Sequence, residues 1–235
     1  LYVEYLQKGD KQFPFFTIYS KILSGGGFMF IEKSLKEYIA VTASGEPTPG
    51  GGSVSALVGS LGGALTSMVK NLTVGKKAYE ELPEEIKNKI LENAKEIEDL
   101  TQDLSNIVDE DTKAFDKVME AFKLPKNTEE EKQKRSQAVQ EGYKVALEVP
   151  LRCAEKCLRI LQLQDVFANY GNVNAITDVG VGTLLAYAGL EGALFNVTIN
   201  LGSIKDEDYK KQHQAKVENL LKEGKALKED LLEIV

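Results

Sequence analysis

Residues 50–70 read GGGSVSALVGSLGGALTSMVK, a run that opens with three glycines and carries no charge before Lys70. Small side chains let a neighbouring backbone come close, so such a run is typical of a helix buried between other helices. A membrane-spanning helix needs about 20 predominantly apolar residues, whereas this run is shorter and is interrupted by serines and threonines. We therefore expect a buried helix. Its small residues are Ala56, Gly59, Gly62, Gly63 and Ala64.

The loop 44–52 precedes this helix and follows a shorter one that begins with a capping box at 34–37. Consecutive glycines at 50–52 allow backbone N–H groups to approach a ligand closely. The helix behind them adds unpaired N–H groups and the positive end of its dipole, which suits a carboxylate, a pterin carbonyl or an oxyanion. The alternative is a flexible turn with Ser53 as the helix N-cap. No Lys-Ser/Thr pair follows the last glycine, so a Walker-type phosphate loop is excluded.

Residues 1–28 differ from the rest in their aromatic cluster and their run of glycines before Met29. They lack the basic and apolar regions of a secretory signal. We expect an N-terminal extension that is poorly packed and is not part of the natural protein, with Met29 as the natural start. A short extra strand or arm is the alternative. The domain proper is then 29–235.

Two long helices are predicted downstream. Pro83 suits a first helical turn, and apolar residues recur at helical spacing over 84–123. A second capping box at 128–131 starts a helix that continues through Leu163 and contains Pro150, which should kink it. The pattern predicts an all-α fold: an elongated helical bundle with two long antiparallel helices, extended by a partner chain into a dimer.

The stretch 167–204 is apolar except for Asp178, Glu191 and several amides. Placing a carboxylate and amides in apolar surroundings is costly unless they pair with each other, with backbone or with a ligand. A pterin ring offers such an edge of donors and acceptors, while helix capping by Asp178 is the structural alternative. We prefer helix to strand for 197–201, and expect a charged amphipathic helix over 206–235. The polar group is Asn172, Asn174, Asp178, Asn196 and Asn200.

Composition narrows the chemistry. The net charge of -7 argues against duplex nucleic acid as a partner. Cys153 and Cys157 lie four residues apart on one expected helix face, which favours half-buried thiols in the reduced cytoplasm over disulfides or zinc. His213 is the single histidine, so proton transfer would fall to carboxylates, lysines or hydroxyls. We expect no metal site.

Two further groups carry weaker signals. Lys76 and Lys77 follow the small-residue helix, where positive charge ordinarily compensates the helix dipole. They could instead meet the anionic tail of a ligand. Asp109 and Asp111 lie in the first long helix and, considered alone, are expected to be solvated surface charges.

Taken in order, these motifs resemble the cyclodeaminase/cyclohydrolase family. It includes the cyclodeaminase half of formiminotransferase-cyclodeaminase and stand-alone bacterial methenyltetrahydrofolate cyclohydrolases. The resemblance runs from about Ser34 to Glu207 and implies an all-α dimer of long helices. The residues that carry it are Thr48 to Ser53, Asn71, Thr73, Lys76, Lys77, Tyr79, Asp111, Ala114, Phe115, Val149, Pro150, Gly171, Asn172, Asn174, Asp178, Asn196, Val197, Ile199 and Asn200.

The resemblance implies chemistry at the carbon between N5 and N10 of a tetrahydrofolate. Water opens the methenyl ring to give 10-formyltetrahydrofolate, or ring closure of the 5-formimino compound releases ammonia. The resemblance implies that neither reaction needs a metal or a redox cofactor, so we expect no cofactor. Asp178 is the expected acid/base and Asp111 the second candidate. The resemblance implies a substrate contact for each of the following: Thr48, Gly50, Gly51, Gly52, Ser53, Asn71, Thr73, Asn172, Asn174, Asn196 and Asn200, with Lys76 and Lys77 for the glutamate tail.

The two reactions are separated by one observation. No formiminotransferase domain accompanies these 235 residues to deliver a formimino group, so we expect the cyclohydrolase, with the cyclodeaminase as the alternative. A non-catalytic helical dimerisation scaffold is the second alternative. It predicts that the polar groups of 172–200 are tied up within the protein and that no cleft lies at the triple glycine. A pocket lined jointly by the triple glycine and Asp178 would instead favour the enzyme. A membrane protein is not expected.

Overall fold

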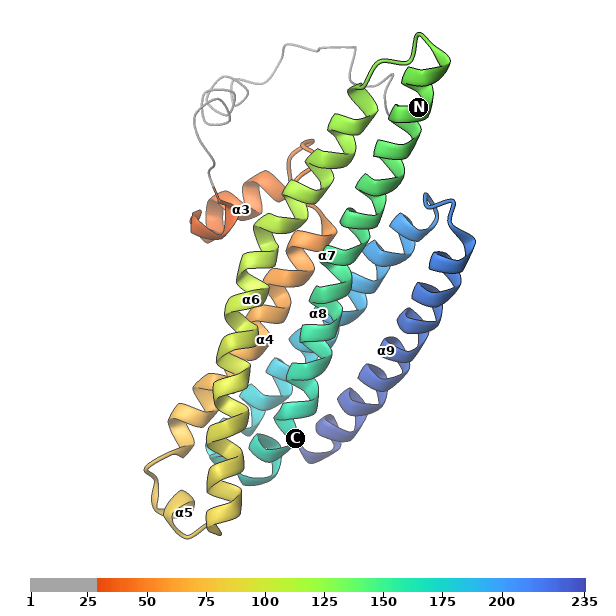
Figure 1. Cartoon of the computed structure of the whole chain (residues 1–235). Helices are drawn as coiled ribbons and strands as arrows, with labels where there is room; N and C mark the ends of the chain where they lie inside the picture. Colours follow the sequence, from red (N-terminus) through yellow and green to blue (C-terminus); the bar gives the residue numbers. More distant parts are fainter. Residues whose placement is uncertain (1–28) are drawn as a thin grey trace.

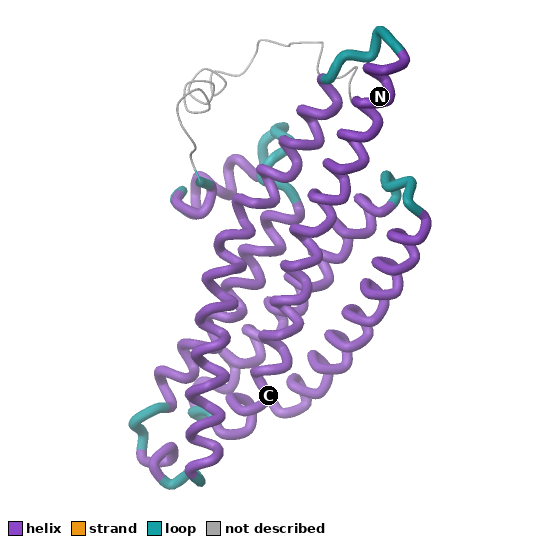
Figure 2. Tube along the Cα trace, viewed as in Figure 1, coloured by secondary structure: helices purple, strands orange, loops and turns teal. Residues whose placement is uncertain are grey.

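The structure, a computed structural model, describes residues 29–235, which form an all-helical bundle of seven α-helices with no strand in that range (Figures 1 and 2). The expected all-α fold is confirmed. The expectations for residues 1–28, including their loose packing and the start at Met29, lie outside the described residues.

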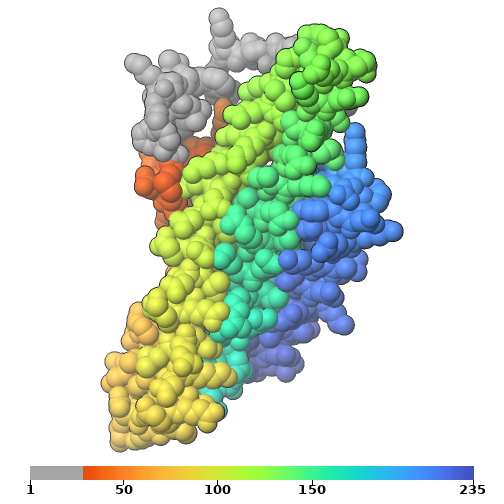
Figure 3. All heavy atoms as spheres, in the orientation of Figure 1, coloured from red at the N-terminus to blue at the C-terminus, as the bar shows by residue number. Residues whose placement is uncertain are grey.

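The bundle is elongated, with the antiparallel α6 and α7 on one side and α4 and α8 behind them, while α9 covers the edge beside α7 and α8 (Figures 1 and 3). The helices are η1 (Phe30–Glu32), α3 (Leu35–Thr42), α4 (Gly51–Thr73), α5 (Lys77–Glu80), α6 (Glu84–Lys123), α7 (Glu129–Tyr170), η2 (Val173–Ala175), α8 (Ile176–Leu201) and α9 (Glu207–Ile234).

Most helix boundaries follow local signals in the sequence. Both capping boxes form, with Ser34 and Thr128 accepting hydrogen bonds from the third residue of their helices. The bounds of α6 and the helical state of 197–201 are also as predicted. The second long helix, however, continues to Tyr170 rather than ending at Leu163. The last turns stay helical because Val166 and Phe167 are fully buried in the core.

The start of α4 excludes the alternative in which Ser53 is the helix N-cap. Gly50 is the N-cap and the helix begins at Gly51, so Ser53 lies inside the first turn and does not cap it. The Ser53 side chain is fully buried, and its Oγ lies 3.0 Å from the Tyr38 hydroxyl. The hydroxyl is therefore oriented towards α3 and not back to the helix N-terminus.

α4 and α8 pack with their backbones in contact. A Cβ atom on Gly62 would lie 2.8 Å from the Gly182 carbonyl oxygen, and one on Gly189 would lie 2.9 Å from the Gly59 Cα. Larger side chains would force the helices apart. The small residues of α4 thus serve the close helix contact that the sequence predicts.

Two apolar stretches, Gly51–Thr73 and Val173–Leu201, have the length and composition of membrane spans. In the bundle, 56% and 44% of their most apolar windows are buried. Buried fractions near one half are expected for core helices that have one side covered by the bundle and the other side uncovered. Cys153 and Cys157 are free, as predicted, and fully buried, whereas they were expected to be half-buried.

Pro150 lies inside α7 and has no N–H to donate to the Ala146 carbonyl one turn earlier. Asn200 of α8 replaces that donor: its Nδ2 donates to the Ala146 oxygen at 2.9 Å. Pro150 and Asn200 both belong to the motifs of the family resemblance. They are structurally coupled, because the proline removes a hydrogen-bond donor and the asparagine supplies one. Asn200 was expected to contact substrate, and the sequence did not indicate this structural hydrogen bond.

We predict that Asn200→Ala lowers the free energy of unfolding by about 1–3 kcal/mol, because a buried carbonyl loses its only side-chain donor. Pro150→Ala restores the backbone N–H, so the same Asn200→Ala change should cost less in that background. Urea unfolding of the four proteins gives the coupling free energy. An equal cost of Asn200→Ala in both backgrounds would contradict this account.

Candidate functional site

Asp111 of α6 lies against the glycines that begin α4. The Ser53 N–H donates to Asp111 Oδ2 at 3.0 Å, and a Cβ atom on Gly52 would lie 2.1 Å from Asp111 Oδ1. Only glycine fits at position 52 while the carboxylate stays in place. The triple glycine therefore admits a carboxylate from another helix as well as any ligand.

The environment of Asp111 gives it acid/base character. Burial raises the pKa of the Asp111 carboxyl above its ordinary value, and the Ser53 N–H opposes that rise. A carboxyl whose pKa moves towards neutrality exchanges protons more readily at physiological pH. Among the carboxylates that sequence analysis proposed as catalytic, Asp111 has the surroundings that such chemistry requires.

Tyr38 of α3 completes this group and was not identified from the sequence. Its ring is 6% exposed and its hydroxyl lies 3.0 Å from Ser53 Oγ. Burial raises the pKa of Tyr38, and the nearby Asp111 and Asp109 carboxylates add to the rise. Tyr38, Ser53 and Asp111 thus form a chain of polar groups behind the glycines. A tyrosine in a short helix carries no sequence signal for this position.

Asp109 is buried, contrary to the expectation of a solvated surface charge. It is 4% exposed and accepts the backbone N–H groups of Phe30 and of Ile31, the latter at 3.4 Å. It was expected, with Asp111, to be a solvated surface charge, and this is wrong for both residues. The segment before α3 and the start of α4 fold over α6 at this level, which the local sequence of α6 does not indicate.

Asn196 of α8 lies at the same end of the bundle. A Cβ atom on Gly51 would lie 3.2 Å from Asn196 Nδ2, which donates to the Gly192 carbonyl at 2.9 Å. Thr48, half-buried, precedes Pro49 through a cis peptide bond in the loop that leads to these glycines. The structure therefore brings together Thr48, Gly50, Gly51, Gly52, Ser53, Asp111 and Asn196.

The remaining predicted residues gather at the opposite end of α4. The Asn172 N–H donates to Thr73 Oγ1 at 2.8 Å, and its Nδ2 donates to the Leu72 carbonyl at 2.9 Å. Asn174 donates its N–H to Asn172 Oδ1 at 3.0 Å. Asp178 is in the first turn of α8, whose N-cap is Ala175. The capping alternative for Asp178 is therefore wrong. Asn71, Lys76 and Lys77 are exposed at this end.

These two ends are far apart. α4 has 23 residues and thus spans about 34 Å, and α8 runs antiparallel to it. The predicted residues do not form one site within a single chain: Asp178 and the lysines lie one helix length from Asp111. We call them the glycine end and the lysine end of α4.

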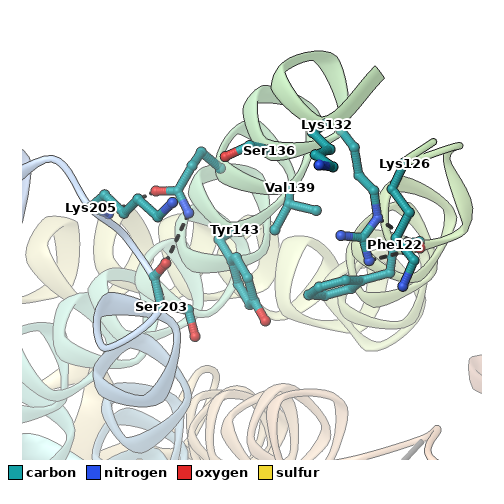
Figure 4. A pocket seen from close by; sticks show the side chains of 10 residues that line it. Phe122, Lys126, Lys132, Ser136, Val139, Tyr143, Ser203 and Lys205 are labelled. Carbon is teal, nitrogen blue, oxygen red and sulfur yellow. Dashed lines mark hydrogen bonds between the residues drawn. The ribbon is translucent and has the colours of Figure 1, made fainter. Parts of the chain in front are cut away.

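The described residues line at least two surface cavities. One, of about 490 Å³, lies beside the α6–α7 turn and is shown in Figure 4. The other, of about 360 Å³, lies between α4 and α6 and includes Asn71. Neither is lined jointly by the triple glycine and Asp178.

Among the described residues no cluster of metal-ligand side chains is found, and the histidine lies away from both ends of α4. Within 29–235, no group of three or more His, Cys, Asp or Glu side chains could hold a metal ion. His213 stacks on Tyr209 with ring centroids 3.8 Å apart, and its Nε2 lies 3.2 Å from Glu148 Oε1. It belongs to the contact between α7 and α9 and not to either end of α4.

The chain is similar to known proteins over most of its length. The family described as formiminotransferase-cyclodeaminase matches residues 34–219. The chain is 41% identical over 203 residues to a methenyltetrahydrofolate cyclohydrolase of Methylorubrum extorquens, covering 86% of this chain and 96% of that protein. It is 35% identical over 202 residues to formimidoyltransferase-cyclodeaminase of Mus musculus, of whose length it spans 37%.

A solved structure agrees with these sequence matches. The crystal structure of formiminotetrahydrofolate cyclodeaminase from Thermotoga maritima superposes with a TM-score of 0.75 at 28% identity, covering 86% of this chain and 96% of that one. Sequence and fold agree, and the chain belongs to the formiminotransferase-cyclodeaminase family, among its cyclodeaminase and cyclohydrolase members.

Proposed function

We propose that this protein hydrolyses 5,10-methenyltetrahydrofolate to 10-formyltetrahydrofolate, with Asp111 as the acid/base. One observation carries the proposal: a carboxyl with a raised pKa lies against the glycine start of α4. The 41% identity to a named methenyltetrahydrofolate cyclohydrolase over nearly the whole of both chains supports the choice of reaction.

The residues at the glycine end suit this chemistry. The Asp111 carboxylate takes a proton from water as the oxygen adds to the methenyl carbon. It then returns a proton to N5, so that the bond between that carbon and N5 breaks and the formyl group stays on N10. The hydroxyl of the tetrahedral carbon loses its proton to solvent. The N–H groups of Gly51 and Gly52 have no acceptor within the helix and can bind a pterin carbonyl or a developing oxyanion.

The ammonia-releasing closure of 5-formiminotetrahydrofolate is the second candidate. The Thermotoga structure and the animal relatives carry that activity in their names. The reaction passes through a tetrahedral carbon at the same place and needs one group to move a proton onto the leaving nitrogen. Asp111 serves both reactions equally, so a paired assay must decide between them.

A non-catalytic scaffold explains part of the structure. Asn172, Asn196 and Asn200 are each hydrogen-bonded within the protein, as that alternative predicts. It does not explain Asp111, because a carboxyl whose pKa is raised by burial destabilises the fold at neutral pH. A group kept at a cost to stability points to catalysis.

We also propose that the protein is a homodimer that pairs through the outward sides of α4 and α8. Exposed apolar side chains follow helical spacing on both helices, with Phe195 68% and Ile199 72% exposed. Large apolar side chains exposed along two adjacent helices are typical of an interface. The other exposed members are Leu61, Met68, Leu72, Val181 and Leu184.

An antiparallel two-fold pairing would bring the lysine end of α4 into a catalytic site. It would place the lysine end of one copy over the glycine end of the other, because the apolar side lies between the two ends. Asp178, Lys76 and Lys77 would then complete the site of the partner. The buried thiols of Cys153 and Cys157 fit a cytoplasmic location for this dimer.

The reaction and its acid/base are tested together. Wild-type protein should consume methenyltetrahydrofolate, followed by loss of methenyl absorbance, faster than it releases ammonia from 5-formiminotetrahydrofolate. Asp111→Asn should lower kcat about 100-fold or more, because no proton acceptor remains. Asp116→Asn, at an exposed position of α6, is the control. Wild-type turnover by Asp111→Asn would refute the assignment and return Asp178 to first place.

Asp111→Asn should also stabilise the protein at neutral pH. The folded-state pKa of Asp111 is raised, so the folded protein favours the protonated form and loses stability as pH rises through that pKa. Asparagine removes this loss while still accepting the Ser53 N–H. Thermal unfolding should show a higher Tm for the variant at pH 7 and a smaller gain at low pH. A lower Tm at pH 7 would contradict the proposed cost of ionisation.

Dimerisation is tested by adding charge to the apolar side. The double variant Phe195→Asp/Ile199→Asp should run as a monomer in light scattering after size-exclusion chromatography, whereas wild-type protein runs as a dimer. Exposed positions on α9, such as Lys222 and Lys225, provide a control by charge reversal. A wild-type monomer, or wild-type protein that requires detergent, would rule the homodimer out.

A further inference from the structure

We propose that Tyr38 is a positioning residue of the reaction, which acts on Asp111 through the Ser53 hydroxyl. In this arrangement Tyr38 donates to Ser53 Oγ, and the Ser53 hydroxyl hydrogen is directed to the ionised Asp111 carboxylate. This role rests on the proposed function and deepens it, because it names the groups that set the proton affinity of the acid/base. Tyr38 is 6% exposed, so it acts from behind the glycines that begin α4 and not from the surface that substrate reaches.

The Ser53 hydroxyl differs from the other buried hydroxyls of α4. A serine or threonine inside a helix commonly donates to a carbonyl three or four residues earlier in its own helix. Four buried hydroxyls of α4 do so, those of Ser55, Ser60, Thr66 and Thr73, at 2.7, 2.8, 3.0 and 2.7 Å. The partner of Ser53 is instead the Tyr38 hydroxyl of α3, at 3.0 Å. Ser53 is therefore held by a second helix.

The Tyr38–Ser53 pair has one hydroxyl hydrogen more than its own hydrogen bond uses. Each hydroxyl carries one hydrogen and can also accept, and one hydrogen lies between the two oxygens. Within residues 29–235, neither hydroxyl has a further hydrogen-bond partner. A phenol is a stronger donor and a weaker acceptor than an alcohol, so Tyr38 donates and the Ser53 hydrogen remains. Ser53 is fully buried, where a hydroxyl hydrogen without an acceptor is costly.

Asp111 is the acceptor that this hydrogen can use. The Ser53 N–H already donates to Asp111 Oδ2 at 3.0 Å, and Asp111 Oδ1 accepts no hydrogen bond from the described residues. The carboxylate charge also reaches the pair, because it adds to the rise in the pKa of Tyr38 that burial causes. Ser53 therefore offers the carboxylate both an N–H and a hydroxyl, and an ionised Asp111 draws the remaining hydrogen.

Packing fixes the Tyr38 ring in place. The ring meets Phe30 edge to face, with ring centroids 6.3 Å apart. Asp109 of α6 accepts the Phe30 N–H, and the capping box at Ser34 starts α3 one turn before Tyr38. The buried Asp109 carboxylate thus fastens the segment that carries the tyrosine. This gives Asp109 a purpose in the site without a place at the reacting carbon.

The pair changes the proton affinity of Asp111 without passing a proton. Tyr38 and Ser53 keep their own hydrogens throughout, while Asp111 takes a proton from water and returns one to N5. The Ser53 hydroxyl stabilises the ionised carboxylate, which begins and ends this cycle. It therefore opposes part of the rise in the Asp111 pKa that burial causes, in the same direction as the Ser53 N–H. Without the pair, Asp111 should stay protonated to a higher pH and serve less well as a base at neutral pH.

Few other charges bear on Asp111. α4 has no charged residue before Lys70, and α8 contributes the uncharged Asn196 at this end. Among the described residues, burial and the Ser53 N–H are the causes of the shift in the Asp111 pKa. The titratable side chains of the neighbouring segments are those of Glu32, Lys33, Tyr38, Asp109, Glu110 and Arg152, of which Arg152 pairs with Glu110 at 2.6 Å. A change in the pH dependence on removing a hydroxyl therefore reports on Asp111.

Tyr38→Phe removes the phenolic oxygen and keeps the ring. With methenyltetrahydrofolate as substrate, it should lower kcat at pH 7 about tenfold, the order expected for one hydrogen bond to a charged group, with KM unchanged. The acid limb of the kcat profile should move to higher pH, so that kcat approaches the wild-type value as pH rises. Ser53→Ala should show the same changes. The double variant should lose no more than the larger single loss, because both changes remove one interaction.

Two matched variants control for the loss of a hydroxyl. Tyr187→Phe removes one from the middle of α8, where Lys228 of α9 lies over the ring. Ser60→Ala removes a buried hydroxyl that bonds within α4. Both variants should keep the wild-type kcat and the wild-type pH profile.

A second readout requires no turnover. The side-chain carboxyl carbon of Asp111 can be assigned in the NMR spectrum of carbon-labelled protein by its loss in Asp111→Asn. It should titrate at a higher pH in Tyr38→Phe than in wild-type protein, and as in wild-type protein in Tyr187→Phe. If no folate is turned over but the titration moves in this way, the proposed function fails and the positioning role of Tyr38 stands.

Two results would overturn the role of Tyr38 while leaving the proposed function intact. The first is a wild-type kcat at every pH in Tyr38→Phe. The second is a lower kcat in Tyr38→Phe with an Asp111 titration that stays in place or moves to lower pH. That second result would show that Tyr38 serves only to pack α3 against the bundle.

Discussion

The backbones of α4 and α8 touch because both helices carry glycine where they cross. Gly62 meets Gly182, and Gly59 meets Gly189, at distances that leave no room for a Cβ atom. Such a contact has one register, since a shift along either helix would place a larger side chain at the crossing. That register fixes which residues share an end of the bundle, and it sets the glycine that receives Asp111 about 34 Å from the far end of α4.

The same contact explains why both helices have the composition of membrane spans. When small residues occupy the inward side, the larger apolar residues must point elsewhere. On α8 they point outward, so Phe195 and Ile199 are largely exposed while Ala186 and Ala193 are fully buried. A helix that is apolar on both sides needs cover on both sides. Composition alone therefore could not separate a lipid from a second protein as that cover.

Helix boundaries that depend on neighbouring residues could be predicted from the sequence, whereas contacts between distant residues could not. Capping boxes and apolar periodicity act over a few residues, so α3, α6 and α7 were located closely. The contact of Asp111 with Ser53 joins residues 58 positions apart, and the contact of Asn200 with Ala146 joins residues 54 apart. No local pattern carries such pairs. The family resemblance ordered the motif residues along the chain but could not show that they divide between two ends.

The glycine end also limits how far the two related reactions can differ. Both reactions need one carboxyl to move a proton at the carbon between two nitrogens, and burial by α4 gives Asp111 that ability in either case. The difference must then lie in what reaches the carbon. Gly51 is exposed and Asp111 is half-buried, so the single chain leaves this end of α4 partly open to solvent. Hydrolysis needs water beside that carboxyl and ring closure with loss of ammonia does not, so the groups that cover this end of α4 are where the two reactions can diverge.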